Sequence, residues 1–335
     1  MKRTFFFFFS FFPFLIGAQT LDLLFSFRTP PNYIRDIVIP PNKSIFYCSS
    51  GEHIVKSRLN KKKFKRKLEF RAEEPYYKSR FSPDGKYFVY TFKDNCLYLY
   101  KRTLTGYRFL QKLEGHDKTQ SVISLCFSPD GKRLLSGGPQ GELILWEIPS
   151  GKQLRKMQVP DRSTVTALAL SGNGEKAAIG TMNSDCYIWT LSADTFSHSV
   201  HTGDFSPGST LQVPSQLAFT EKDSAVMMIV YGGSKTLLHW NPANGKLSAM
   251  KTGGFIPNCF TFARQGRYLV AGTQKGELLF IDPRTGTLLK HLSIASVPVT
   301  SLALTPDSGI LVSGDEEGYV SVWNSQSLFL QLGAE

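Results

Sequence analysis

The sequence predicts an all-β protein, a seven-bladed β-propeller in which each blade is a four-stranded sheet. A short run of alternating apolar residues that ends in a large side chain recurs along the chain, with 41 to 51 residues between successive ends. The seven ends, which include all four tryptophans, are Leu59, Tyr100, Trp146, Trp189, Trp240, Ile281 and Trp323. Self-similarity with a period of roughly 40–45 residues is typical of a propeller blade, so seven ends predict seven blades.

A second repeated feature is the turn that precedes these runs. The segment FSPDGK occurs at residues 81–86 and again at 127–132, and the segments LSGNGEK (170–176) and LTPDSG (304–309) are similar to it. In Ser-Pro-Asp-Gly the proline sets φ, the aspartate bonds the nearby backbone and the glycine accepts a positive φ, which together favour a type I turn. Short strands separated by such turns predict an all-β domain.

The elements follow in chain order from these two markers. The apolar segment LDLLFSF (21–27) comes first, and we expect it to close the ring by pairing with the last blade near 327–332, because a propeller must protect its free sheet edges. The expected blades are 33–70, 75–115, 121–160, 163–203, 213–253, 256–294 and 297–332. The predicted organisation is a segment 1–18, a segment 19–32 with the closing strand, and the propeller over 33–332.

One repeat, LEGHDKTQSVISLCFSPDGKRLLSGGPQGELILWEIPSGKQLRKM, resembles the WD-repeat (WD40-type) β-propeller family, in degenerate form. The resemblance lies in its Gly-His start, its FSPDGKRLLSGG core and its Trp-Glu end. In that family a His, a Ser or Thr, a turn Asp and the Trp form a buried network, which implies these roles for His116, Ser136 and Trp146. The resemblance gives Trp189, Trp240 and Trp323 the same structural position in other blades. The Asp position holds Gln140, so we expect the network to lack its carboxylate.

The N-terminus has the three parts of a secretory signal peptide. Lys2 and Arg3 are basic, residues 5–16 are almost entirely apolar, and Ile16-Gly17-Ala18 has the small residues of a cleavage site. The apolar part is short for a membrane span, which needs about 20 residues. We therefore expect cleavage after residue 18 and export. The alternatives are an uncleaved N-terminal anchor, a buried strand, and a hydrophobic N-terminus that belongs to a cytosolic (cytoplasmic) WD-type scaffold.

The five cysteines do not form the pattern of a disulfide framework. Their number is odd, no Cys-x-x-Cys occurs, and each lies in a different apolar strand. A buried free cysteine behaves as a small apolar side chain. An exported protein with few disulfides fits the bacterial periplasm or cell envelope, which is the predicted location.

Basic residues are concentrated in one segment of a chain whose formal net charge is +12. The expected outer hairpin of the first blade carries Lys61, Lys62, Lys63, Lys65, Arg66 and Lys67. Such a run can bind an anionic glycan or lipid surface. The alternative is that these lysines protect an exposed sheet edge from association. A nucleic acid is not the expected partner.

The sequence shows no catalytic, metal or cofactor pattern. The expected inner strands carry four charged residues, Arg35, Asp36, Lys78 and Arg80, and no pair of carboxylates that a glycosidase would need. His198 and His201 are three apart in an expected strand, so they lie on opposite faces and are a poor metal pair.

A weaker resemblance also argues against a cofactor. The turns IPSGKQL, NPANGKL and DPRTGTLL are similar to those of quinoprotein-like propellers, in which a Trp follows the turn. Here the Trp positions hold Arg155, Ala249 and Lys290, so no cofactor is expected.

The predicted function is therefore that of an exported, non-catalytic and monomeric propeller that acts as a protein-interaction scaffold or binding module. The long insertion at 201–215 is the candidate loop for contact with a partner, because binding residues of rigid scaffolds are concentrated on loops. The rival class is a propeller enzyme whose site is built from loops. The sequence does not indicate which protein is bound.

Overall fold

The computed structural model describes residues 21–29, 33–41, 44–51, 53–59, 67–71, 78–92, 94–117, 122–205, 211–232 and 234–332, with the backbone alone for 67–71, 204–205 and 234. Strands make up nearly all of the regular structure in these ranges. None of the helices found there has the length and hydropathy that crossing a membrane requires.

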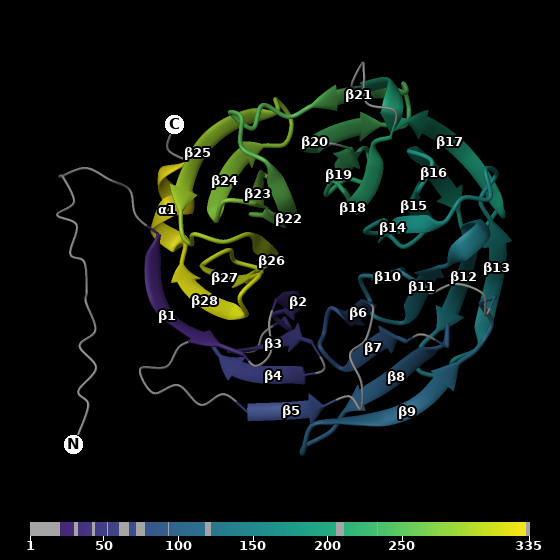
Figure 1. The fold of residues 1–335 in the computed structure, drawn as a ribbon, viewed down its shortest axis with the longest axis horizontal. Helices are drawn as coiled ribbons and strands as arrows, with labels where there is room; N and C mark the ends of the chain where they lie inside the picture. Colours follow the sequence, from purple (N-terminus) through teal and green to yellow (C-terminus); the bar gives the residue numbers. More distant parts are fainter. Residues whose placement is uncertain are drawn as a thin grey trace, which may run out of the picture.

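Seven antiparallel sheets of four strands stand around a common centre, each with one edge strand innermost and the other edge strand at the rim (Figure 1). The strands of the first three blades are β2 (Ile34–Val38), β3 (Ile45–Ser50), β4 (His53–Arg58), β5 (Lys67–Arg71), β6 (Lys78–Phe81), β7 (Tyr87–Thr91), β8 (Leu97–Arg102), β9 (Tyr107–Leu113), β10 (Ser124–Phe127), β11 (Arg133–Gly137), β12 (Glu142–Glu147) and β13 (Gln153–Gln158).

The strands of blades 4 to 6 are β14 (Val165–Leu170), β15 (Lys176–Thr181), β16 (Asp185–Thr190), β17 (Thr195–His201), β18 (Val213–Phe219), β19 (Val226–Gly232), β20 (Ser234–Asn241), β21 (Lys246–Ala249), β22 (Pro257–Ala263), β23 (Tyr268–Thr273), β24 (Glu277–Asp282) and β25 (Thr287–Ser293). Blade 7 contains β26 (Val299–Leu304), β27 (Ile310–Asp315), β28 (Tyr319–Asn324) and β1 (Asp22–Arg28). Two short 3-10 helices, η1 (Pro139–Gly141) and η2 (Thr202–Phe205), and one α-helix, α1 (Gln326–Gln331), complete these elements. The predicted fold class is confirmed.

The apolar core lies between neighbouring blades. In the cluster between blades 2 and 3, for example, Leu97 and Leu99 of β8 pack with Leu134 of β11 and Trp146 of β12, and each of these side chains is at most 2% exposed. Each blade except the last is continuous in sequence, so the ring of cores is complete only when blade 7 meets blade 1.

Strand β1 completes blade 7 at its outer edge (Figure 1). It pairs antiparallel with β28, for instance Phe27 with Val320. The expectation that it would pair near residues 327–332 is wrong, because that segment forms α1. Because β1 already occupies the outer edge of β28, the residues that follow β28 cannot add a further strand to this sheet. Leu328 and Phe329 are buried from the helix instead, in the cluster between blades 6 and 7.

The turns after the inner strands have the geometry that their sequences predict. In blade 2 the hydroxyl of Ser82 donates to Asp84 at 2.6 Å and accepts the backbone N–H of Tyr87 at 2.8 Å. The Asp84 carboxylate also accepts the N–H of Lys86 at 2.9 Å, and Gly85 has a φ of +61°. The FSPDGK segment of blade 3 repeats this arrangement. Each turn therefore sets the register of the hairpin that follows.

Candidate functional site: a cationic central channel

The residues that the repeat pattern singled out form a buried chain of hydrogen bonds in blade 3. The indole N–H of Trp146 donates to Ser136 Oγ at 2.8 Å, and Ser136 Oγ lies 2.7 Å from Nε2 of His116. The other ring nitrogen, Nδ1, lies 3.3 Å from Glu142 Oε2. Because an ionised carboxylate can only accept, Nδ1 carries the proton and Nε2 accepts from the serine. The expectation that the network lacks a carboxylate is therefore wrong.

Glu142 replaces the missing aspartate from a different position. Gln140 lies in η1 with a φ of +54°, and Glu142 begins β12 two residues later. The Glu142 carboxylate also accepts the backbone N–H of Asp117 at 2.8 Å and pairs with Lys156 Nζ at 3.0 Å. Burial opposes the ionised form of Glu142, but these donors outweigh it and keep its pKa below the usual value. Burial lowers the pKa of His116 to about 4, so the ring is neutral at pH 7.

One residue in the second strand decides whether each tryptophan is hydrogen-bonded. Ser136 lies two residues beyond Leu134, the cross-strand partner of Trp146, and Ser313 lies two residues beyond the partner of Trp323. Trp323 Nε1 donates to Ser313 Oγ at 2.9 Å.

The corresponding residues of blades 4 and 5 are Ile179 and Met228. Within the described part of the chain, the indole N–H groups of Trp189 and Trp240 are buried and have no hydrogen-bond partner. These four tryptophans are therefore parts of the packed blades and not of a surface site.

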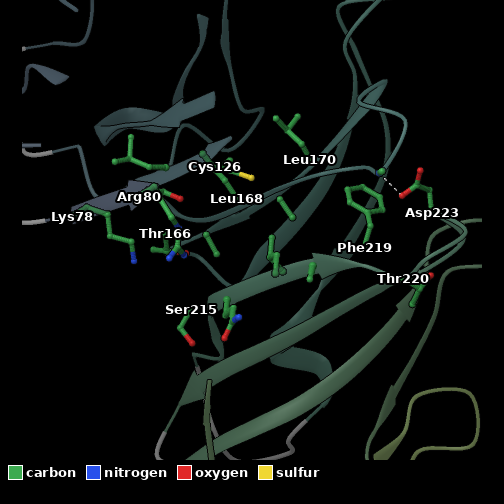
Figure 2. Close-up of a pocket in the computed structure, with 18 of the residues that line it drawn as sticks. Lys78, Arg80, Cys126, Thr166, Leu168, Leu170, Ser215, Phe219, Thr220 and Asp223 are labelled. Carbon is green, nitrogen blue, oxygen red and sulfur yellow. Dashed lines mark hydrogen bonds between the residues drawn. The ribbon is translucent and has the colours of Figure 1, made fainter. Parts of the chain in front are cut away.

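Two adjoining cavities occupy the centre of the ring, with volumes of about 380 and 340 Å³. They share four lining residues, Lys78 and Arg80 from β6 and Ser215 and Gln216 from β18. Figure 2 shows Lys78, Arg80, Thr166 and Ser215 around the same open space. They are the two ends of one channel bordered by the inner strands, and we consider this channel the candidate functional site.

Polar side chains on the inner strands connect blade 4 to blade 5, blade 5 to blade 6, blade 6 to blade 7 and blade 7 to blade 1 around this channel. The donors lie near the beginnings of β14, β18, β22 and β26, and each bonds a backbone carbonyl of the following blade. These bonds are Thr166 Oγ1 to Pro214 O (2.6 Å), Gln216 Nε2 to Phe260 O (2.8 Å), Asn258 Nδ2 to Val299 O (2.8 Å) and Thr300 Oγ1 to Ile34 O (2.7 Å). The channel wall is therefore rigid and polar.

The larger cavity is strongly basic. Among the described residues that line it, the charged side chains are Asp36 and the four bases Arg35, Lys78, Arg80 and Lys235. Sequence reasoning found the four charges on the inner strands but missed Lys235, which comes from β20. The sequence of β20 has no pattern that would show whether this lysine faces the channel or the solvent.

Asp36 and Arg80 compensate one another. Arg80 Nη1 lies 3.0 Å from Asp36 Oδ1, and the backbone N–H of Phe81 donates to Oδ2 at 3.0 Å. Burial raises the pKa of Asp36 above its usual value, against the opposing effect of Arg80. Both carboxylate oxygens thus have partners in blade 2, and this pair joins blade 1 to blade 2 across the channel wall.

Lys78 and Lys235 have no carboxylate partner among the described residues. Burial, followed by the nearby charge of Arg80, lowers the pKa of Lys78 to about 8. Lys235 Nζ is hydrogen-bonded to the neutral side chain of Asn258, and burial lowers its pKa as well. Each of these ammonium groups is therefore held in an environment that disfavours its charge.

In the smaller cavity, the acidic side chains among the described lining residues come from one turn. Asp223 and Glu221 lie in the turn after β18. The Asp223 carboxylate accepts the backbone N–H groups of Gly172 and Asn173 at 2.7 and 3.2 Å, so it links blade 5 to blade 4 (Figure 2).

Other sequence predictions concern the histidines, possible metal ligands and the cysteines. His198 and His201 bind different side chains, Ser197 and Asp185. No group of three or more potential metal ligands occurs within the described ranges. All five cysteines are free.

Three predicted segments lie wholly or partly outside the described residues. The backbone of Lys67 belongs to β5, but Lys61, Lys62, Lys63, Lys65 and Arg66 are outside, so the basic surface stays a prediction. Residues 1–18 are also outside. Of the insertion at 201–215, the described ends are held by Thr202 and Gln212, which both bond the Ser184 turn.

Comparison with known proteins points to one type of repeat. Residues 107–147 and 285–324 match the family model "WD domain, G-beta repeat". The chain contains WD40 repeats. Each matched WD40 segment begins in the outer strand of one blade and ends in the third strand of the next, at Glu147 and Asn324. Because the sequence repeat is offset from the blade by one strand, a strand from elsewhere must complete the last blade, and β1 does so.

WD-repeat relatives are similar to this chain at low identity. Protein ROOT INITIATION DEFECTIVE 3 of Arabidopsis thaliana is 28% identical over 228 residues, which cover 62% of this chain and 50% of the relative. Meiotic recombination protein rec14 of Schizosaccharomyces pombe is 23% identical over 57% of this chain and 62% of the relative. Echinoderm microtubule-associated protein-like 4 of Xenopus tropicalis is 23% identical over 67% of this chain and 23% of its own length. The matched region therefore spans less than two thirds of each of these relatives.

Proposed function

We propose that this protein is a non-catalytic scaffold that binds other proteins, with the channel and the surrounding loops as its contact surface. WD40 propellers are typically interaction proteins, which supports a binding role for this chain. The observation that carries the proposal is the channel itself. Among the described residues, its larger cavity is lined by four basic side chains and by one carboxylate, which is engaged with Arg80. This lining favours the binding of an anionic group.

The test is direct binding to a purified partner. The protein beginning at residue 19 is immobilised, proteins retained at two salt concentrations are identified, and each is then produced separately and titrated by calorimetry. We expect at least one partner to bind saturably with defined stoichiometry and to be recovered chemically unchanged after prolonged incubation. The absence of any saturable protein partner would overturn the proposal. Covalent change in a bound molecule would favour the rival enzyme.

We also propose that the protein is exported to the bacterial periplasm or cell envelope and begins at Gln19. Support comes from the sequence of residues 1–18, with its basic, apolar and small-residue parts. The measurement is the intact mass and N-terminal sequence of the protein isolated from an envelope fraction. A chain that starts at Met1, or protein found in the cytoplasm alone, would contradict this proposal.

The basic segment 61–67 is proposed as a second contact surface, for an anionic glycan or lipid. Replacing Lys61, Lys62 and Lys63 with Gln is expected to weaken binding to anionic vesicles and to flatten its salt dependence. The thermal midpoint is expected to change little, since exposed charges contribute little to folding. Unchanged binding with an unchanged salt dependence would leave edge protection as the role of this segment.

A further inference from the structure

The charge balance of the larger cavity is the starting observation. Among the described residues, four basic side chains and one acidic side chain line a volume of about 380 Å³, so basic groups outnumber acidic ones in this lining. A narrow channel with walls of low dielectric constant concentrates the field of such groups and attracts anions. The protein itself supplies Asp36 as the counter-charge, and its two oxygens are already occupied by Arg80 and by Phe81 N–H.

Lys78 is the basic group of this cavity whose charge has the fewest partners in the described part of the chain. It is the first residue of β6, and its ammonium group has no hydrogen bond or ion pair to any described residue. Figure 2 shows its side chain extending into the open centre beside Arg80 and Thr166. A partly buried ammonium group without an acceptor destabilises the protein unless an anion accompanies it.

Lys235 contributes a second positive charge to the same cavity, from a different blade. It is the second residue of β20 in blade 5, and it lines the same cavity as Lys78 of blade 2. Its hydrogen bond goes to the amide oxygen of Asn258, which satisfies one donor, and the charge of Glu316 only partly opposes the effect of burial on its pKa, which stays below the usual value. Two lysines from two blades thus present ammonium groups to one enclosed space.

We propose that the channel binds an acidic segment of a protein partner, whose carboxylates pair with Lys78 and Lys235. The inference rests on the proposed scaffold function and names the chemistry that its channel recognises. The cavity volume is in the range of sites for small ligands, so a chain segment enters and a folded domain does not. The hydroxyl oxygens of Ser215 and Thr300 on the wall can accept backbone N–H groups of that segment, since their own protons are donated to Ile229 O and Ile34 O.

Separate carboxylates fit this site better than a phosphate group does. Phosphate recognition commonly relies on the planar fork of an arginine with two donors directed at one anion. Here Nη1 of Arg80 is engaged by Asp36, and the guanidinium of Arg35 lies 4.5 Å from the centre of the Tyr33 ring. The two lysines lie on different blades and act as separate point charges, an arrangement that suits separate carboxylates.

Protonation of Lys78 gives the site a pH dependence. The titratable and charged groups that face it are Asp36, Arg80, Arg35 and Lys235, with the thiols of Cys126 and Cys259 in the channel wall. Its pKa of about 8 means that the lysine loses its charge in the weakly alkaline range. The affinity for a carboxylate segment is therefore expected to fall between pH 7 and pH 9, a range given as roughly one unit on either side of that pKa.

The experiment uses a fluorescent hexapeptide of alternating Asp and Glu and a matched peptide of Asn and Gln, titrated with the chain beginning at residue 19 and followed by anisotropy. The channel variant is Lys78→Met with Lys235→Met. The control variant is Lys152→Met with Lys222→Met, which removes two exposed lysines and has the same net charge. Circular dichroism and thermal midpoints establish that each variant is folded.

We expect the acidic peptide to bind the wild-type and control proteins and the neutral peptide to bind neither. The channel variant should bind at least about ten-fold more weakly, as is usual when one member of a desolvated charge pair is removed. Should the channel variant fail to fold, the decline of wild-type affinity from pH 7 to pH 9 provides the same test.

Equal affinities of the channel and control variants would overturn the inference and assign the peptide to another basic surface. Displacement of the peptide by tripolyphosphate at far lower concentration than by free acidic peptide would also overturn it, in favour of a phosphate ligand. If a protein partner is captured and the acidic peptide does not bind, this inference fails while the proposed scaffold function stands. If no protein partner exists and the peptide still binds the channel, the proposed scaffold function fails, and of this inference only the recognition of carboxylates by Lys78 and Lys235 stands.

Discussion

Single hydrogen-bonding residues determine how each blade satisfies its buried polar atoms. Ser136 serves two partners, Trp146 and His116, whereas Ser313 serves Trp323. In blades 4 and 5 an apolar residue replaces this serine, and the indole N–H has no acceptor among the described groups. The serine was identifiable from the resemblance to WD repeats. Glu142 was not, because it lies two positions from the expected acid and reaches His116 only through the course of η1.

Removal of the Ser136 hydroxyl is expected to cost more stability than removal of the Ser313 hydroxyl. In Ser136→Ala two buried groups lose a partner, and each unsatisfied group costs about 1–3 kcal/mol. In Ser313→Ala the Trp323 indole loses its partner. The measurement is the midpoint of chemical denaturation at unchanged slope for the two variants. Equal midpoints would show that loss of the hydrogen bond from Ser136 to His116 does not lower the stability.

His116 makes the stability of the protein sensitive to mild acid. Its pKa in the folded state, about 4 because of burial, is below the unfolded value of 6.5. Between these values the unfolded chain binds a proton that the folded chain excludes, so stability falls as the pH decreases from 6.5 to 4. The contribution of this residue is on the order of 3 kcal/mol, at 1.36 kcal/mol per pH unit.

The comparison that checks this prediction is between the wild-type protein and His116→Gln, with the unfolding free energy measured at pH 7, 6, 5 and 4. We expect the difference between the two to shrink as the pH falls, since the glutamine variant does not take up this proton on unfolding. Parallel curves for the two proteins would contradict a neutral, buried His116.

Among the secondary-structure elements, some could be predicted from nearby sequence signals and others could not. The Ser-Pro-Asp-Gly turns and the four tryptophans were predictable because their signals lie within a few residues of one another. The helix α1 was not, because a short apolar run such as that at 327–332 fits a strand or a helix equally well. Only the presence of β1 on the edge of β28 decides between the two.

Trp146→Ala is expected to destabilise the protein more than Trp323→Ala. Loss of a buried tryptophan costs roughly 3–5 kcal/mol, and the two side chains are 2% and 8% exposed. Trp146 also belongs to the four-membered network of a blade that is continuous in sequence. Blade 7 depends on a strand from the other end of the chain, so it is expected to open first. Denaturation midpoints of the two variants give the ranking, and a larger loss for Trp323→Ala would reverse it.

At the scale of the whole molecule, the ring is held closed by contacts between its two sequence ends. Phe27 of β1 is 9% exposed and packs in one cluster with Phe46 of blade 1 and Val320 of blade 7. Closure also includes the Thr300 bond to Ile34 O at 2.7 Å. These contacts join segments more than 260 positions apart in the chain.

Phe27→Ala is expected to lower the free energy of unfolding by roughly 3–5 kcal/mol, the usual cost of removing a buried aromatic ring. The matched control is Leu23→Ala on the same strand, where the side chain is 53% exposed and the expected change is within about 0.5 kcal/mol. Hydrogen exchange of the β28 amides should accelerate in the first variant and remain unchanged in the second. Similar stability of both variants would mean that β1 does not hold the ring closed.

The sequence by itself determined the number of blades, their approximate spans, the turn geometry and the burial of the tryptophans. These properties are repeated locally, and each copy of the repeat carries its own turn and its own apolar alternation. The tertiary structure decided the partner of β1, the completion of the His116 network by Glu142 and the joining of Lys235 to the cations of the inner strands. Such contacts connect different blades or different turns, and no local pattern specifies them. They arise only when seven sheets close around one centre and bring charges from distant segments into the same channel.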